Sequence, residues 1–437
     1  MSELGWFDRL LIDRRFTGVL WVLVATGTIY LAYRNYLPLL GHEITNANGY
    51  AGDFWGFLHA SRQIAAGHSP YNLLSNGENG VGYVYSPFLA VLLLPFTHLA
   101  TIDVWEGWNL VSLGCVILAI GVVVATEVPA DQAWVRPVLF GFAAVTGMQT
   151  AIMVNELYNG QTDTITLALL SFAAAMLTRR RWATSGALVG VAGLIKTWPA
   201  TIAVTFLTKH VKPEHRWRAL VAWVVTIAVA PLLAVILGGI SELRDWLRIT
   251  FDARSQHLVS FSVSGAPKIL FSHNGFARPL VDSSGLQAVA TIVLAAWVIG
   301  LLVLTLRRCT DITIGFWQVT VCVVLLVPAS HEFYCLYTLP LLWIWGARAL
   351  EARSFRSVEA LVVTMLLVCW VVMYHDWNPY KTGLPAWHYV ILFFANLAAV
   401  TISVLGERLR DRTSSHLPYS SASGRVTLWG ASEGTRP

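Results

Sequence analysis

Residues 184–208 read TSGALVGVAGLIKTWPATIAVTFLT, a long run in which Lys196 is the only charged side chain. An α-helix needs about 20 consecutive apolar residues to cross a bilayer, and this run is long enough to enter one. A lysine deep in such a run costs about 3 kcal/mol on insertion scales, so it should face a polar cavity or the membrane surface. Pro199 lies close by and favours a break in the helix at this point.

The whole chain has the same apolar character. Of its 437 residues, 56% are hydrophobic and only 13% are charged, whereas soluble domains carry about 25% charged residues. A soluble fold cannot bury this much apolar surface, so lipid must cover it. The net charge of +5 comes without a basic patch interleaved with aromatic residues, which argues against a nucleic-acid partner.

Apolar runs recur along the chain, and each should be helical because a lone segment in lipid must satisfy its own backbone hydrogen bonds. The alternation over about ten residues that is typical of a membrane β-barrel is absent. We therefore predict an all-α polytopic membrane protein, a bundle of about 12 (range 11–14) transmembrane helices with extracytoplasmic loops and interfacial helices. The runs lie at 17–36, 87–102, 105–127, 134–158, 161–178, 184–208, 217–239, 286–306, 312–330, 334–348, 358–375 and 387–405.

The orientation follows from clusters of lysine and arginine, which favour the cytoplasmic side. With one helix for each run, the cluster Arg179–Arg181 would fall outside. The conflict disappears if the run 134–158 turns near Gly147 and the run 184–208 turns near Lys196. All basic clusters and both termini are then cytoplasmic. They lie around Arg9 to Arg15, Arg179 to Arg181, Lys209 to Arg218, Arg307 to Arg308, Arg348 to Arg356 and Arg408 to Arg412.

In this arrangement, residues 1–413 form a single transmembrane domain in the plasma membrane. Two polar stretches, about 37–86 and 241–285, lie outside, together with the tips near Asn159, Lys196 and His331. Residues 53–66 and the stretch around Trp246 have the pattern of amphipathic helices lying in the interface. The tail 414–437 is rich in Ser and Gly and is expected to be disordered and cytoplasmic.

Asp53 is the first candidate for chemistry, because it opens the predicted interfacial helix after Gly-Tyr-Ala-Gly. A carboxylate there is stabilised by the helix dipole by about 0.3–1 kcal/mol. The residue alone is explained as well by a helix cap, and the functional alternative is a general base for an acceptor hydroxyl. Lys196 has a similar pair of explanations, which are snorkelling to a headgroup and binding a phosphate at an outward tip.

Two further polar clusters interrupt apolar runs. The first runs from Asn155 to Asp163 and is either a polar turn or part of a site. The second is His331–Glu332, and a histidine can donate to a phosphate or relay a proton near neutral pH. Other outer residues are candidates for sugar and phosphate contacts, namely Arg62, His68, Tyr71, Tyr83, Tyr85, Arg254, His257, Lys268 and His273. Neither a metal-ligand spacing nor a nucleotide-binding glycine loop is present in the sequence.

Taken together, these features resemble glycosyltransferase family 87, within the GT-C class of multi-span enzymes that use polyprenyl-phosphate sugars. Four elements between about residues 50 and 210 carry the resemblance in order and spacing. They are Asp53-Phe54 with Arg62 and Gly67-His68-Ser69-Pro70-Tyr71, then Tyr83-Val84-Tyr85-Ser86-Pro87, then Asn159-Gly160-Gln161, and Gly186, Gly190, Lys196 and Pro199. Ser86 stands where many relatives have a second proline.

The resemblance implies a catalytic base at Asp53 and a second active-site residue at His331. It also implies a polyprenyl-phosphate sugar as donor, most often mannose and otherwise arabinofuranose, and a glycolipid or glycan hydroxyl as acceptor. With one base and a phosphate leaving group, a single displacement would invert the anomeric carbon without a nucleotide or another cofactor, and the sequence leaves a metal requirement open. The substrate-binding residues expected from these motifs are Arg62, Tyr71, Tyr85, Asn159, Gln161 and Lys196.

Two other functions explain part of the pattern. A secondary transporter would account for the hydrophobicity and the broken helices, although an internal repeat is absent and the polar residues cluster on one side. A lipid-sugar flippase would share the phosphate-binding features but would not need Asp53 as a base. The transferase remains the favoured hypothesis because it uses both Asp53 and Lys196.

Overall fold

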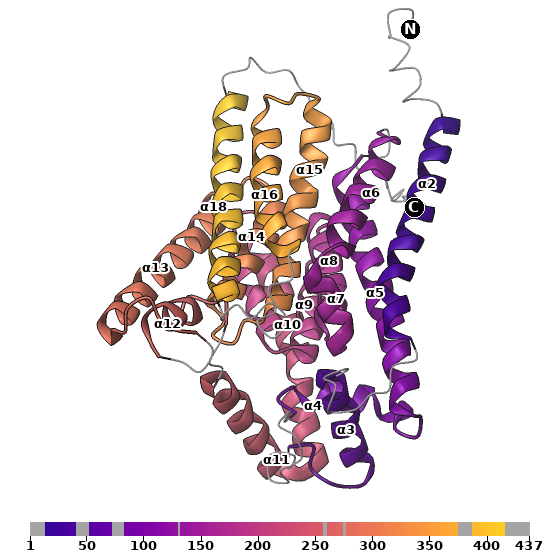
Figure 1. Ribbon diagram of the computed structural model, residues 1–437, viewed down its shortest axis with the longest axis vertical. Helices are drawn as coiled ribbons and strands as arrows, with labels where there is room; N and C mark the ends of the chain where they lie inside the picture. The colour runs from indigo at the N-terminus through magenta and orange to yellow at the C-terminus, as the bar shows by residue number, and fades with distance from the viewer. Residues whose placement is uncertain are drawn as a thin grey trace, which may run out of the picture.

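The computed structural model describes residues 14–40, 52–71, 83–129, 132–256, 260–273, 277–374 and 387–415. Throughout these ranges the regular elements are helical (Figure 1). They are α2 Arg14–Tyr36, η1 Leu37–Leu39, α3 Gly52–Ala65, α4 Pro87–Leu92, η3 Leu94–Phe96, α5 Thr101–Glu127, α6 Val135–Met148, α7 Ala151–Asn159, α8 Asp163–Thr178, α9 Trp182–Ile195, η4 Trp198–Leu207, α10 Pro213–Ile227, α11 Val229–Gln256, α12 Gly265–Phe271, α13 Ser284–Arg308, α14 Ile312–Leu326, η5 Glu332–Thr338, α15 Leu339–Ala352, α16 Val358–Tyr374 and α18 Trp387–Ser415.

The predicted class, an all-helical polytopic membrane protein, is confirmed. Within the described part of the chain, five helices are long and apolar enough to cross a membrane, or up to six if one bent pair counts as a span. Several other predicted runs form apolar helices of 10–17 residues. Of the predicted tail 414–437, the residues from 416 on lie outside the described residues.

Both predicted helix breaks are present. Helices α6 and α7 meet at an angle of 63°, and Thr150 caps α7 by accepting a hydrogen bond from the backbone of Met153 at 3.0 Å. Helix α9 ends at Lys196, whose backbone is extended, and the 3₁₀ segment η4 then begins with Pro199 in its first turn. Each break therefore sits where the sequence supplies a cap or a proline.

One predicted run does not form a span. Residues 87–102 give only the short helix α4 and the 3₁₀ turn η3. Pro95 lies within η3, where it lacks the N–H that a continuing helix would need. The segment instead packs beside α3, whose buried Ser61 hydroxyl donates to Ala90 O at 2.5 Å.

Three basic clusters lie together at one end of the bundle, which we call the basic end. Trp182 stacks on His215, with ring centroids 5.2 Å apart. The backbone N–H of Lys209 donates to Leu306 O at 3.3 Å. These contacts join the clusters at 179–181, 209–218 and 307–308.

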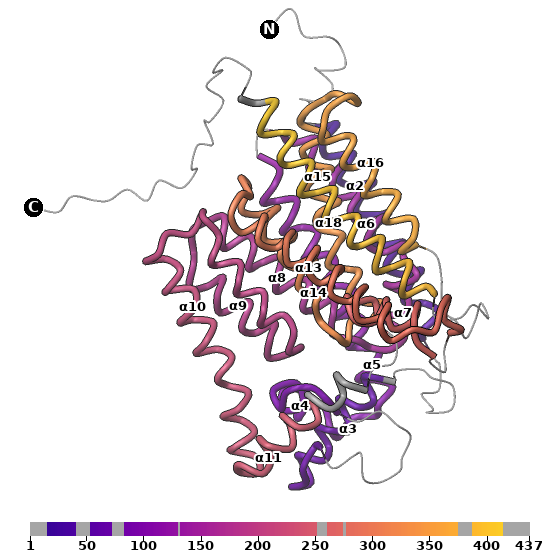
Figure 2. Tube along the Cα trace, turned by 90° about the vertical axis from the view of Figure 1, so that its left-hand side faces the viewer, coloured from indigo at the N-terminus to yellow at the C-terminus, as the bar shows by residue number. Residues whose placement is uncertain are grey.

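A buried ion pair extends the basic end to further helices. Arg348 of α15 pairs with Glu127 of α5 at 3.3 Å and with Asp311 before α14. Glu407 of α18 accepts a hydrogen bond from the backbone N–H of Thr310 at 2.6 Å. The first residue of α2 and the last of α18 lie at this same end in both views (Figures 1 and 2).

Helices α3, α4 and the outer half of α11 project at the opposite end (Figure 1). Helix α11 is kinked at Gly238 and Gly239, and Gly239 has a φ of 75°. The apolar face that predicted an interfacial helix in α3 is buried against the protein, since Phe54, Phe57 and Leu58 are each at most 2% exposed. Protein rather than a bilayer therefore covers most of that face.

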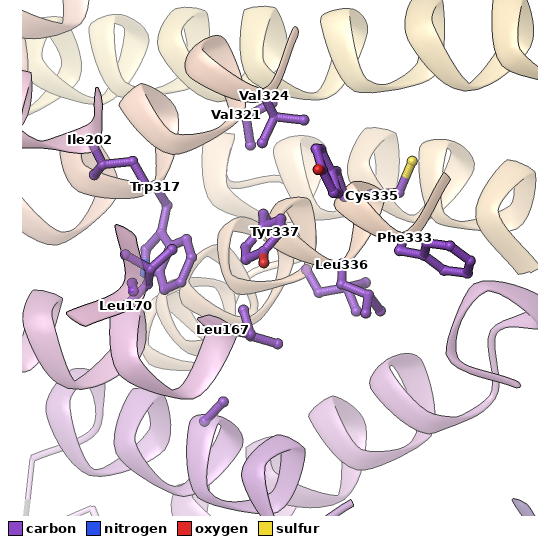
Figure 3. Packing of buried hydrophobic residues seen from close by; sticks show 14 of the residues in the cluster. Leu167, Leu170, Ile202, Trp317, Val321, Val324, Phe333, Cys335, Leu336 and Tyr337 are labelled. Carbon is purple, nitrogen blue, oxygen red and sulfur yellow. The ribbon is translucent and has the colours of Figure 1, made fainter. Parts of the chain in front are cut away.

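The core lies between α8, η4, α14 and η5. Figure 3 shows Leu167 of α8, Ile202 of η4, Trp317 of α14 and Tyr337 of η5 directed into a shared interior. Trp317 and Tyr337 are fully buried. This packing fixes the end of α8 that carries the polar cluster predicted around Asp163.

Candidate active site

Asp53 lies in the first turn of α3 and is half-buried. Its carboxylate accepts a hydrogen bond from the side-chain amide of Gln161. Burial raises the pKa of Asp53 to about 6, while the positive charge of Lys196 opposes the rise and the negative charge of Asp163 adds to it. A carboxyl group with this pKa is mostly ionised at neutral pH and is matched to accepting a proton.

Gln161 joins Asp53 to Tyr85. The Tyr85 hydroxyl lies 3.4 Å from Gln161 Oε1, in hydrogen-bonding geometry. The backbone carbonyl of Gln161 accepts from the indole N–H of Trp108 at 3.0 Å, and that of Tyr85 accepts from the Tyr71 hydroxyl at 3.0 Å. The backbones of Gln161 and Tyr85 are therefore each held by a hydrogen bond from another part of the chain.

Gly160 explains why the Asn-Gly-Gln element lies against the Asp-Phe pair. Gly160 ends α7 in the left-handed conformation, with a φ of 63°. A Cβ at this position would come within 2.6 Å of the Phe54 Cβ and 3.1 Å of Trp105. Only glycine allows this approach, which carries Gln161 to the start of α3.

Lys196 sits at the break between α9 and η4 and is 4% exposed. Its ammonium donates to Asp163 Oδ2 at 2.5 Å and lies 4.4 Å from the centre of the Tyr334 ring. The Tyr337 hydroxyl donates to the other oxygen of Asp163 at 2.9 Å. The lysine predicted to face a polar cavity or the membrane surface is thus paired with a buried carboxylate.

A small pocket of about 90 Å³ opens beside Lys196. Tyr85, His331 and Thr250 also line it. His331 lies edge-on to Tyr334, with ring centroids 6.0 Å apart. Residues that are far apart in the sequence therefore converge on one pocket, which we call the site pocket.

The family model described as "Glycosyltransferase family 87" matches residues 83–330. The chain belongs to glycosyltransferase family 87. The matched region contains Tyr85, Gln161 and Lys196, while Asp53 precedes it and His331 directly follows it. Membership makes the chain a membrane glycosyltransferase, and it favours an enzyme over the transporter and flippase alternatives.

A curated relative from Mycolicibacterium smegmatis is 26% identical over 334 residues, which make up 73% of this chain and 75% of the relative. That protein is named a polyprenol-phosphate-mannose-dependent alpha-(1-2)-phosphatidylinositol pentamannoside mannosyltransferase. The aligned stretch is long enough to cover most of both chains. The similarity is therefore not confined to one motif.

Three of the residues expected to bind substrate in this family 87 enzyme do not line the site pocket. The Arg62 guanidinium donates to Thr97 O at 3.2 Å, Leu99 O at 2.9 Å and Thr101 Oγ1 at 3.0 Å. Asn159 donates to the backbone of α7 one turn earlier, at 2.8 Å. The Tyr71 hydroxyl donates to the backbone carbonyl of Tyr85.

The fold of the glycosyltransferase also brings in residues that the motifs did not single out. Tyr334 and Trp198 line the site pocket beside Lys196, and Tyr337 binds Asp163. The aromatic stretch that follows His331 could have indicated the two tyrosines as site residues. No sequence pattern marked Thr250 as a site residue, because its position in the site pocket depends on how the second half of α11 folds back. His257 lies outside the described residues, and the side chain of Arg254 is not described.

Proposed function

We propose that the enzyme transfers mannose from a mannosyl-phosphopolyprenol to a hydroxyl group of a glycolipid, with inversion of the anomeric carbon. One observation carries the proposal. The Asp53 carboxylate is hydrogen-bonded through Gln161 to Tyr85, and Tyr85 lines the site pocket together with the ammonium group of Lys196. A displacement at a sugar phosphate needs a proton acceptor on one side and a cation beside the leaving group on the other.

The donor phosphate would occupy the site pocket. Lys196 and His331 both line it and offer N–H donors to phosphate oxygens. These groups lie in a mostly apolar surrounding where they interact more strongly with charge than they would in water. They stabilise the negative charge that develops on the departing phosphate.

Asp53 would take the proton from the acceptor. The acceptor oxygen forms a bond to the anomeric carbon while the bond from that carbon to the phosphate oxygen breaks. The electron pair of the broken bond stays on the phosphate, and the acceptor proton moves to the carboxylate. Gln161 holds that carboxylate through its amide, which orients it toward the acceptor.

The same geometry supports an extracytoplasmic active site. Lysine and arginine clusters favour the cytoplasmic side of a membrane, and three such clusters form the basic end. Asp53 lies at the opposite end with α3 and α4. Both termini would then be cytoplasmic, and residues 1–413 would act as one domain.

The relative's name supports mannose as the sugar and a phosphatidylinositol mannoside as the first acceptor to test. Arabinofuranose is the second donor to test. The site pocket would contact the phosphate of either donor. The selectivity for one sugar would therefore depend on the space between Asp53 and the pocket.

The deciding experiment uses the purified chain in nanodiscs with radiolabelled mannosyl-phosphopolyprenol and phosphatidylinositol mannosides. We expect labelled glycolipid with wild type and a loss of about a hundredfold or more with Asp53→Asn. Asp103→Asn, on the exposed first turn of α5, is the matched control and should retain activity. The anomeric configuration of the product would be read by NMR.

Other results would redirect the assignment. Transfer only from the arabinofuranosyl donor would replace the sugar. Full activity in Asp53→Asn would remove Asp53 as the base and leave it a structural role at the start of α3. A folded wild type inactive with both donors and a total lipid acceptor extract would overturn the proposed function.

A further inference from the structure

The lysine of the site pocket is balanced by a carboxylate that the pocket does not reach. The ammonium of Lys196 contacts Asp163 at 2.5 Å, and their side chains are 5% and 0% exposed. Lys196 lines the pocket whereas Asp163 does not. The carboxylate therefore lies behind the lysine, and a ligand in the pocket meets a cation whose charge is already partly neutralised.

Asp163 is held firmly in that place. The Tyr337 hydroxyl binds one of its oxygens at 2.9 Å. Its backbone N–H and that of Thr164 donate to Glu156 Oε1 at 2.8 and 3.1 Å, which fixes the first turn of α8. Asp163 can act on a substrate only through Lys196 and through its own electric field.

The charge on the phosphate changes during transfer. In the donor the phosphate is a diester with a single negative charge. In the product it is a monoester, which carries about −1.5 to −2 at neutral pH because its second pKa is about 6. A lone buried lysine would hold the product more tightly than the donor, and slow product release limits turnover in many enzymes.

We propose that Asp163 is a positioning residue that aims Lys196 at the donor phosphate and weakens the binding of the polyprenyl phosphate product. This inference rests on the proposed function. The carboxylate repels any phosphate in the pocket, and it repels the more highly charged product more strongly than the donor. The enzyme thereby keeps a cation for the leaving group without trapping it.

The test measures the binding of polyprenyl phosphate to the purified full chain in nanodiscs of neutral lipid. Asp163→Asn keeps the shape and a hydrogen-bond acceptor but removes the charge. We expect it to bind polyprenyl phosphate on the order of tenfold more tightly than wild type. The KM for the donor should fall less than the product inhibition constant, and kcat should fall.

Tyr337→Phe is the matched control. It removes a hydrogen bond to the same carboxylate and leaves all charges in place, so the affinity for product should change by less than about threefold. If this variant bound polyprenyl phosphate tenfold more tightly, the cause would be the weakened hydrogen bonding of Asp163 and not its charge. That result would overturn the proposal. Equal or weaker binding in Asp163→Asn would overturn it as well.

A charge cycle keeps the proposal testable if Asp163→Asn fails to fold. Lys196→Gln should weaken product binding by at least about tenfold. The double variant Lys196→Gln with Asp163→Asn removes both charges of the pair and should bind more tightly than Lys196→Gln alone. Double-variant binding no better than the single variant's would indicate a merely structural role for Asp163 and overturn the proposal.

The outcomes separate this inference from the proposed function. Normal mannosyl transfer without any tightening in the variants would overturn the role of Asp163 and leave the proposed function standing. A folded wild type that neither binds polyprenyl phosphate nor transfers sugar would overturn both.

Discussion

Gly160 lies directly against Phe54, such that a Cβ added at Gly160 would come within 2.6 Å of the Phe54 Cβ. The two residues are adjacent to the polar pair Gln161 and Asp53. This contact therefore couples the end of α7 to the start of α3, and it sets the position of the proposed base relative to the amide that binds it.

Gly160→Ala should lower both stability and transfer. The left-handed backbone costs about 1–2 kcal/mol for alanine, and the clash adds about 1–3 kcal/mol of overpacking. Gly67→Ala is the matched control, because Gly67 has a φ of 76° and nothing within 4 Å of an added Cβ. Thermal unfolding in detergent measures the stability of the two variants. Equal losses of stability in Gly160→Ala and Gly67→Ala would rule out a role for the Phe54 contact.

The rate of transfer should fall as the pH drops through about 6. Burial raises the pKa of Asp53 to about 6, and a protonated carboxyl cannot accept the acceptor's proton. Removing the negative charge in Asp163→Asn should lower this pKa and shift the acid limb to lower pH. Lys196→Gln should shift it to higher pH. Profiles of kcat/KM against pH for the three proteins test this, and an unmoved acid limb would argue against Asp53 as its source.

Arg62→Met should destabilise the fold without acting on the donor. All three interactions of its guanidinium go to residues 97–101, so its loss leaves those carbonyls and the hydroxyl without their donor. We expect a lower unfolding temperature and a donor KM within about threefold of wild type. A large rise in KM with unchanged stability would restore Arg62 as a substrate contact.

Arg348→Met should lower the stability of the protein by breaking a buried ion pair at the basic end. Arg348 pairs with Glu127 and Asp311, and both its side chain and that of Glu127 are less than 10% exposed. Breaking such a buried pair leaves uncompensated carboxylates and costs about 3–5 kcal/mol. Arg356→Met, at an exposed position on the same end, is the control and should unfold at the wild-type temperature. An unchanged unfolding temperature in Arg348→Met would show that the ion pair adds no net stability.

The orientation can be read from single cysteines labelled in intact cells. His68 is exposed beside α3 and Arg179 is exposed at the basic end. We expect His68→Cys to react with a membrane-impermeant maleimide from outside. Arg179→Cys should react only after permeabilisation. The reverse pattern would place the site pocket on the cytoplasmic side.

The sequence alone was enough for the class of the protein and for its helix breaks. Hydropathy is a local property, and the turns near Gly147 and Lys196 follow from the placement of the basic clusters, with Pro199 close to the second turn. The prediction of a membrane span at residues 87–102 was wrong. The run is apolar, but Pro95 and the contact of Ser61 with Ala90 divide it into short turns. Composition could not distinguish these outcomes.

The candidate site was only partly accessible in this way. The sequence singled out Asp53 because it opens a predicted helix, and Gln161, Lys196 and His331 because they belong to polar positions that interrupt apolar runs. It also favoured Arg62, whose guanidinium is directed to a neighbouring loop. Whether a side chain points into a pocket or away from it depends on partners far along the chain, and no local pattern records that.

The sequence by itself determined that the chain enters a membrane as a helical bundle, since lipid requires apolar helices with internal hydrogen bonds. Only the tertiary structure decided that Lys196 meets Asp163, that Gly160 admits Phe54, and that Tyr85 and His331 share one pocket. Those contacts arise from packing among helices that are distant in sequence, where the shape of each surface selects its partner.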